Sequence, residues 1–291
     1  MTPRDSESSL PRLREVLPRD GFQDLPIRVP TSLKVDIIHK VHAVGCRWIE
    51  VTSFVHPRQV PQFFDAEQVV AATRELPGVT VSAFVPNRHG LQRAMAAGTD
   101  EVSLAVATTD ALAESNFRQS REELITESLA VAEEALGARK MVSITIGGAF
   151  GCPFEGPVRP ETVVEIVEQI VSGGVTTVLL ADTIGVGTPE GVGELIGLVV
   201  EQLPDIEFGV HIHGQQGIDS VRTALDAGAT IVDTSMGGFG GCPFVPDAPG
   251  NVDTALVAQL LADSGQWEGP EPSQLLACSA DVRKVLGPFD G

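Results

Sequence analysis

Short apolar runs alternate with longer amphipathic stretches along most of the chain. The apolar runs have the length of strands and lie at 13–17, 47–53, 79–85, 101–106, 141–146, 176–181, 208–213 and 230–235. The stretches between them have the periodicity of helices and lie at 31–44, 65–76, 87–97, 121–136, 160–172, 189–202, 215–227 and 251–262. Eight such alternations predict a parallel (β/α)8 barrel, with a doubly wound open sheet as the alternative.

The ends of the chain differ from this repeating part. Residues 1–10 are polar and rich in serine, which predicts a disordered tail. The remainder, 11–291, contains no Pro-, Gly- or Ser-rich linker, so we expect one catalytic domain. Its last segment, 270–291, carries apolar residues at 275–278 and 282–286, and we expect it to cap the barrel as a final helix.

Composition narrows the class of protein. No apolar run reaches the ~20 residues of a membrane span, and the N-terminus lacks the pattern of a secretory signal. Four cysteines without paired spacing fit a reducing cytoplasm. A formal charge of −19 argues against a nucleic-acid or anionic-membrane partner. An anionic substrate would therefore need local positive charge, from a metal or a buried arginine.

Polar residues gather at the predicted strand ends. The carboxyl ends of all strands meet at one rim of a (β/α)8 barrel, where its active sites lie. The residues placed at or near this rim are Arg19, Asp20, Glu50, Asp182, His211, His213, Cys242 and Asn251. A shared rim predicts a catalytic site.

His211 and His213 lie two residues apart on one strand, so their side chains point to the same face. By itself such a pair is more often two ordinary polar residues. With the carboxylate of Asp20 and the amide oxygen of Asn251, however, it makes a mixed nitrogen and oxygen set that suits Mg²⁺ or Mn²⁺. The alternatives are a turn residue for Asp20 and a helix N-cap for Asn251.

Two further residues have chemistry that suits such a site. Arg19 stands beside Asp20, where its guanidinium could stabilise an enolate or carboxylate oxygen; a surface ion pair is the alternative. Cys242 follows a glycine-rich run at 237–241 that could form a lid, and its thiol could exchange a proton with substrate. A packing role is the alternative for this cysteine.

Five segments resemble 3-hydroxy-3-methylglutaryl-CoA lyase. They are LPRDGFQ at 17–23, IEVTSFV at 49–55, FGCPFEG at 150–156, ADTIGVGTP at 181–189 and GGCPF at 240–244. The resemblance runs in order from about residue 13 to about residue 262. The chain is thereby identified as a divergent member of this family of metal-dependent TIM-barrel lyases.

The resemblance implies cleavage of a 3-hydroxy-3-methylglutaryl-type acyl-CoA, by retro-Claisen chemistry, to acetyl-CoA and a keto product. The positions that match the family's metal ligands are Asp20, His211, His213 and Asn251. A homodimer that takes a small-molecule acyl-CoA substrate is expected. Two alternatives are a Claisen-type transferase and a barrel that binds metal and ligand without turnover.

The resemblance also implies roles for the other rim residues. Arg19 matches the arginine that stabilises the enolate of acetyl-CoA, and Cys242 matches the loop cysteine that protonates it. Glu50 and Asp182 match acidic residues of the site, and Asp182 or His211 would take the hydroxyl proton.

Several positions differ from the family pattern. Glycine and glutamine at 214–217 replace Asp-Thr-Tyr-Gly, the acidic pair after Asn251 is missing, and His56 and Gln59 replace a serine and a tryptophan. The metal set is retained, whereas the acyl group of the substrate is left open. We expect His56 and Gln59 to face the acyl portion or its entrance.

Overall fold

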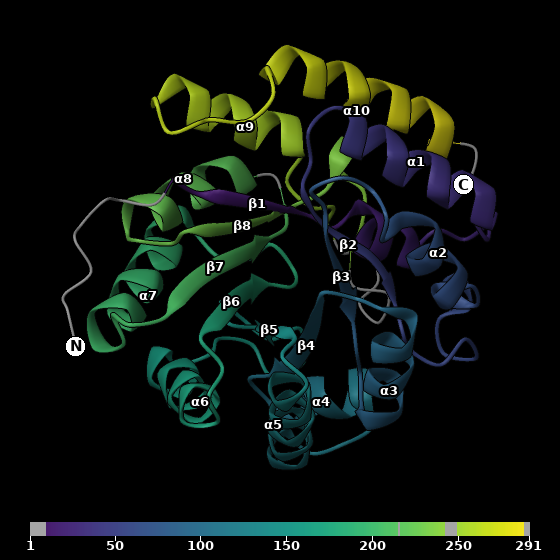
Figure 1. The fold of residues 1–291 in the computed structure, drawn as a ribbon. Coiled ribbons are helices and arrows are strands. Elements are labelled where there is room, and N and C mark those ends of the chain that lie inside the picture. Colours follow the sequence, from purple (N-terminus) through teal and green to yellow (C-terminus); the bar gives the residue numbers. More distant parts are fainter. Residues whose placement is uncertain (1–9, 215, 242–248, 288–291) are drawn as a thin grey trace.

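Eight parallel strands close into a barrel in the computed structural model, which describes residues 10–214, 216–241 and 249–287 (Figure 1). Neighbours in the barrel are neighbours in sequence, and the first strand pairs with the eighth. The (β/α)8 prediction is confirmed and the open sheet is excluded. The strands are β1 (Arg12–Glu15), β2 (Trp48–Ser53), β3 (Thr80–Phe84), β4 (Glu101–Ala107), β5 (Met141–Gly147), β6 (Thr177–Asp182), β7 (Glu207–Ile212) and β8 (Ile231–Thr234).

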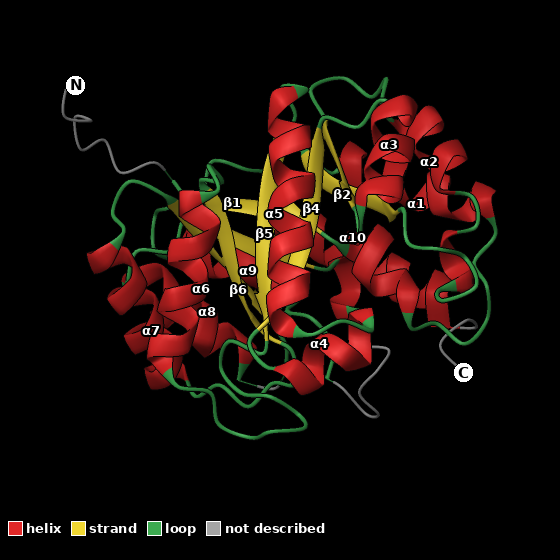
Figure 2. Cartoon of the chain, turned by 90° about the horizontal axis from the view of Figure 1, so that it is seen from below, coloured by secondary structure: helices red, strands yellow, loops and turns green. Residues whose placement is uncertain are grey.

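Helices surround the strands (Figure 2). They are α1 (Thr31–Ala43), α2 (Ala66–Thr73), α3 (Arg88–Ala97), α4 (Asp110–Phe117), α5 (Arg121–Gly137), α6 (Pro160–Ser172), α7 (Pro189–Gln202), α8 (Gly217–Asp226), α9 (Thr254–Asp263) and α10 (Pro272–Leu286). The expected C-terminal helix is α10, which packs on α9 and contacts α1, and so completes the outer layer. None of the described helices is both long and apolar enough to cross a bilayer.

Three differences from the predicted elements affect the site or the outer layer. The first strand stops at Glu15, and the π-helical turn η1 (Leu17–Gly21) follows, in which the N–H groups of Asp20 and Gly21 donate to the carbonyl of Val16. Helix α9 begins at Thr254 with Asp253 as its N-cap, so Asn251 precedes the helix. Helix α4 was not predicted, because its eight residues give too short a periodic pattern.

The barrel interior contains many buried polar side chains. In β4, the buried Glu101 and Ser103 reach side chains of other strands, while the intervening Val102 and Leu104 belong to the hydrophobic core. This division follows the period of two along a strand. The apolar side chains thus hold the helices, which leaves the interior for charged and hydroxyl groups that must satisfy one another.

Glu15 ties three segments together at the end of β1. Its Oε1 accepts the backbone N–H of Leu17 at 3.0 Å and of Met236 at 2.9 Å. Its Oε2 accepts the hydroxyl of Thr254 at 2.7 Å. Met236 begins the short turn η3 (Met236–Gly238), and Thr254 begins α9. One buried carboxylate therefore fixes the start of three segments that lead toward the rim.

Replacing Glu15 with glutamine should change how stability depends on pH. Burial raises the pKa of Glu15 from 4.5 to about 7. Between these values the unfolded chain releases a proton that the folded protein keeps, so the free energy of unfolding falls as pH rises. Glutamine has no such proton, so this pH dependence should disappear in Glu15→Gln. The change in the free energy of unfolding caused by the substitution should therefore be more favourable at pH 8 than at pH 4, by up to about 3 kcal/mol. Urea denaturation at several pH values measures it.

The contrasting variant is Glu67→Gln. The hydrogen bond from Arg93 lowers the pKa of Glu67, so its ionised form contributes stability above the unfolded pKa and loses it as pH falls. Its replacement should therefore lower stability at neutral pH. Identical pH profiles for Glu15→Gln and the unmodified protein would contradict the assigned burial effect.

Candidate metal centre and adjoining cavity

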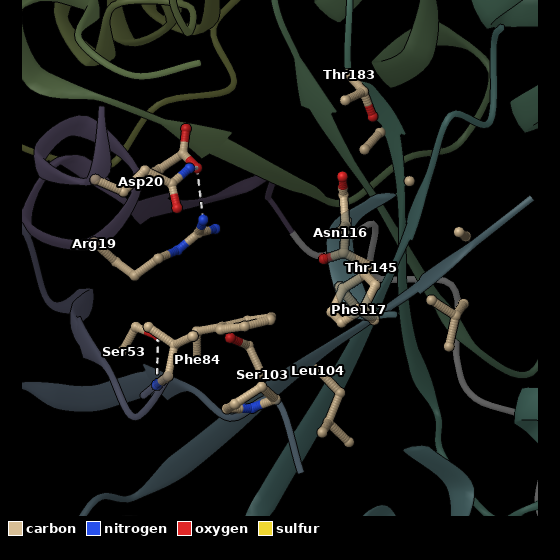
Figure 3. A pocket seen from close by; sticks show the side chains of 18 of the residues that line it. Arg19, Asp20, Ser53, Phe84, Ser103, Leu104, Asn116, Phe117, Thr145 and Thr183 are labelled. Carbon is tan, nitrogen blue, oxygen red and sulfur yellow. Dashed lines mark hydrogen bonds and ion pairs between the residues drawn. The ribbon is translucent and has the colours of Figure 1, made fainter. Parts of the chain in front are cut away.

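A cavity of about 250 Å³ opens at the carboxyl ends of the strands. Figure 3 shows Arg19 and Asp20 on one side of it and Asn116, Phe117 and Thr145 on the other. Of the predicted rim residues, those that line it are Arg19, Asp20, Glu50, His211 and His213. The common rim expected from the strand order thus contains a real concavity.

Asp20, His211 and His213 form a buried cluster in this cavity. Their candidate ligand atoms all lie within 4.8 Å of one another. The two Nε2 atoms are 2.8 Å apart, and each lies 3.9 Å from Oδ2 of Asp20. Two imidazole nitrogens at this distance can share only one proton, so a cation between them and the carboxylate would satisfy all three groups. The arrangement fits a divalent metal.

Asn251 joins the cluster through backbone pairing. It forms an isolated antiparallel bridge with His213, and Val252 N–H donates to the carbonyl of Ile212 at 3.3 Å. Its Nδ2 donates to Oδ2 of Asp20 at 2.6 Å, while its Oδ1 is buried without a hydrogen-bond partner within the described residues. A buried oxygen without a hydrogen-bond partner beside the cluster is the kind of ligand atom that a hard cation would bind.

Gly240 approaches this group closely. It adopts a φ of +110°, and a Cβ there would meet Asn251 and lie 2.6 Å from Oδ2 of Asp20. A side chain at this position is thus excluded by both conformation and space. The glycine-rich run therefore has a steric reason at this position: it lets the backbone pass directly over the cluster.

The cluster is in the charge state that metal ligation needs. Burial opposes ionisation of Asp20, but Arg19 and the two histidines outweigh it and lower the pKa of this carboxyl. Burial, together with the neighbouring His211, lowers the pKa of His213 to about 3. At neutral pH the carboxylate is therefore ionised and this imidazole is neutral, so both hold free lone pairs.

Arg19 is fixed inside the cavity. Its Nε donates to Oε2 of Glu50 at 2.5 Å, and its Nη1 donates to Oδ1 of Asp20 at 2.5 Å. The other carboxylate oxygen of Glu50 accepts the hydroxyl of Ser103. Glu50 is fully buried and Arg19 lies over the ring of Phe84. The alternative of a surface ion pair is excluded.

Asp182 lies at the end of β6 but is not among the residues that line the cavity. Its carboxylate accepts the backbone N–H of Val186 at 3.0 Å and of Gly187 at 2.9 Å. Burial raises the pKa of Asp182, and these hydrogen bonds only partly offset it. The predicted Cys242 lies outside the described residues. Gln59 lines the cavity, whereas His56 is exposed and accepts the N–H of Arg58.

Three residues near the cluster were not singled out from the sequence. Gln23 donates to Oδ1 of Asp20 at 2.7 Å and to the carbonyl of Gly241 at 3.0 Å. Ser103 donates to Glu50, and Asp233 contacts Nδ1 of His211 at 3.0 Å. Ser103 and Asp233 are polar residues within otherwise apolar strands, and that pattern could have identified them.

The HMGL-like family model matches residues 11–282 of the chain. The chain belongs to the HMGL-like family. Cytoplasmic 3-hydroxy-3-methylglutaryl-CoA lyase of Rattus norvegicus is 36% identical over 281 residues, which span 94% of this chain and 81% of that protein. The predicted family is confirmed, and the chain is a carbon–carbon lyase of this group.

Solved structures agree. HMG-CoA lyase from Acinetobacter baumannii, in complex with coenzyme A and 3-methylmalate, superposes with a TM-score of 0.91 at 30% identity, over 97% of this chain and 93% of that one. The enzyme from Brucella melitensis gives a TM-score of 0.90 at 33% identity, over 96% and 99%. The barrel and its loops therefore follow those of the family over nearly the whole chain.

A divalent cation should stabilise the folded protein through this cluster. Mn²⁺ at 100 times its Kd should add about 2.7 kcal/mol to the free energy of unfolding. His213→Ala should abolish most of this gain, because it removes a ligand, whereas the exposed His39→Ala should retain it. Thermal unfolding with and without Mn²⁺ measures the effect. Equal stabilisation of His213→Ala and the unmodified protein would contradict the cluster as the metal site.

Proposed function

We propose that the chain cleaves a 3-hydroxy-3-methylglutaryl-type acyl-CoA into acetyl-CoA and a keto product. The observation that carries this proposal is the fixed guanidinium of Arg19 beside the Asp20–His211–His213 cluster, in a chain of this family. Retro-Claisen cleavage needs a hydroxyl group made acidic and a cation that stabilises the enolate of the departing acetyl group. The guanidinium and the candidate metal cluster that would meet these two needs line the same cavity.

The residues that would hold the metal are Asp20, His211, His213 and, through its Oδ1, Asn251. A nitrogen and oxygen set without thiolate suits Mg²⁺ or Mn²⁺. When bound, such an ion would acidify the hydroxyl group of the substrate and bind an oxygen of the substrate's carboxyl group. Nδ2 of Asn251 and Nε2 of Gln23 both donate to Asp20, which keeps the orientation of its carboxylate.

Arg19 is proposed to stabilise the enolate oxygen. Its hydrogen bonds to described residues use Nε and Nη1, which leaves Nη2 for a substrate oxygen. Glu50 is proposed to orient this guanidinium, because it accepts from Nε and is itself fixed by Ser103. A cation held in place before the charge develops lowers the barrier without reorganising at that moment.

For the hydroxyl proton we propose Asp182 as the acceptor. His211 has Asp233 at its Nδ1 and the metal cluster at its Nε2, so neither nitrogen is available. The raised pKa of Asp182 favours proton uptake. Its carboxylate now binds the backbone of the loop after β6, so a shift of that loop is required. Protonation of the enolate by Cys242 stays a prediction.

The partner and location predictions stay open beyond the acyl-CoA substrate. The homodimer stays a prediction. The rat relative is named as a cytoplasmic enzyme and the Bos taurus relative as a mitochondrial one, so the cytoplasmic location of this chain also stays a prediction.

A panel of branched 3-hydroxy acyl-CoAs with Mg²⁺ or Mn²⁺ tests the activity. We expect acetyl-CoA release from members that carry a second carboxylate. Carbon–carbon bond formation from acetyl-CoA and a keto acid, without detectable cleavage, would favour the transferase instead. Tight binding of the CoA ester without any product would favour a barrel without turnover.

Arg19→Met should lower kcat by ~10²–10³ while leaving Mn²⁺ affinity within a few-fold of normal, because the cation is needed as enolate charge develops. Arg12→Met is the matched control, since Arg12 makes an exposed ion pair with Glu207. The control should retain full kcat. Steady-state kinetics and metal titration separate the two effects, and normal turnover by Arg19→Met at saturating metal and substrate would exclude its assigned role.

A further inference from the structure

Strand register brings three charged or ionisable side chains into one row. Arg14 of β1 pairs with Asp233 of β8, and Asp233 pairs with His211 of β7. Residues paired in this way point to the same face of a sheet, here the barrel interior. The exposed fractions are 1% for Arg14, 1% for Asp233 and 7% for His211. The row therefore lies out of water, directly behind the cluster.

The contacts along this row are directional. Nε of Arg14 donates to Oδ1 of Asp233 at 2.8 Å, and Nη2 donates to Oδ2 at 2.9 Å. The same Oδ2 lies 3.0 Å from Nδ1 of His211. Both oxygens of Asp233 accept from Arg14, so the contact with His211 is one in which His211 donates its Nδ1 proton to Oδ2. Its Nε2 then carries the lone pair, and this atom faces Nε2 of His213.

The guanidinium of Arg14 is itself held from the other end of the barrel. Its Nη1 donates to Oγ of Ser143 at 2.8 Å, and Ser143 donates to Oε1 of Glu101 at 2.8 Å. The ring of Trp48 lies 5.5 Å from its central carbon, and the indole N–H of Trp48 donates to Glu101. Arg14 thus has partners on four other strands, which fixes the plane of its fork.

We propose that Arg14 and Asp233 are positioning residues for the metal ligand His211. Asp233 holds the imidazole in the tautomer whose Nε2 can bind a cation, and Arg14 holds the carboxylate of Asp233 in the plane that reaches Nδ1. This role rests on the proposed metal site, but the tautomer of His211 is set in the metal-free protein as well.

Asp233→Asn tests the role with little change in volume. If the new amide nitrogen takes the place of Oδ1, it meets the donor Nε of Arg14. If it takes the place of Oδ2, it meets Nη2 and forces Nδ1 of His211 to accept, which puts a proton on Nε2. The first orientation breaks the link to Arg14 that holds the side chain in its plane, and the second reverses the tautomer of His211. Mn²⁺ affinity should fall ~10–100-fold, the usual effect of losing such a partner.

Asp65→Asn is the matched control. Asp65 is as buried as Asp233 and also forms an ion pair, with Lys34 at 2.7 Å, but it contacts neither Arg14 nor His211. It should lower the melting temperature without weakening Mn²⁺ binding by more than a few-fold. Calorimetric titration with Mn²⁺ and thermal unfolding of the metal-free proteins separate affinity from stability. A ratio near one between the Mn²⁺ affinities of Asp233→Asn and Asp65→Asn would overturn the proposal.

Two further measurements keep the test decisive if Asp233→Asn does not fold. Arg14→Lys keeps the charge but not the two-pronged contact, and it should weaken Mn²⁺ binding by several-fold. Nitrogen-15 NMR of His211 in the metal-free unmodified protein should show a protonated Nδ1 and an unprotonated Nε2. The opposite tautomer would overturn the positioning role even if Mn²⁺ binds. Absence of Mn²⁺ binding by the unmodified protein, with the expected tautomer, would instead overturn the metal assignment alone.

Discussion

Ionised carboxylates buried inside the barrel need cations, and two arginines supply them. Arg14 lies between Asp233 and Glu101, and Arg19 lies between Asp20 and Glu50. Removing one partner of such a pair leaves an uncompensated buried charge, which costs about 3–5 kcal/mol. The two arginines therefore offset the cost of burying these four carboxylates. In the metal-free protein the candidate metal cluster depends on both arginines, because Arg19 pairs with Asp20 and Arg14 pairs with Asp233, the partner of His211. A bound divalent cation would itself compensate Asp20.

Both arginines come from one short stretch of chain. Arg14 points into the barrel from β1, and Arg19 projects from the π-helical turn that begins two residues after the strand ends. Glu15 fixes that turn to the starts of η3 and α9. A few consecutive residues thereby place the interior cations, one candidate metal ligand and the start of η3, which leads into the glycine-rich segment. The early end of the first strand is what makes this placement possible.

The sequence was sufficient for features that depend on local periodicity and on long motifs. Eight strand–helix alternations predicted the barrel, and strand ends predicted the rim that holds Arg19 and the histidines. It was not sufficient where contacts join distant segments. Nothing near Arg14 in the sequence indicates that it is buried and paired, because its partners Glu101, Ser143 and Asp233 lie 87, 129 and 219 residues away. The backbone bridge between Asn251 and His213 likewise could not be predicted from the hydrophobic periodicity of the sequence.

Burial acts on every one of these groups, yet its outcome differs with the neighbours. It raises the pKa of Glu15 to about 7, because the hydrogen bonds from neutral donors do not offset burial and the nearby Asp253 adds to it. At Asp20 the nearby guanidinium reverses the effect, and at His213 burial itself keeps the imidazole neutral. A carboxylate already ionised and an imidazole already neutral do not have to release protons when a cation arrives. The candidate ligands are thus prepared by charge as well as by geometry, and the arginine that lowers the pKa of Asp20 is also the one proposed to stabilise the enolate.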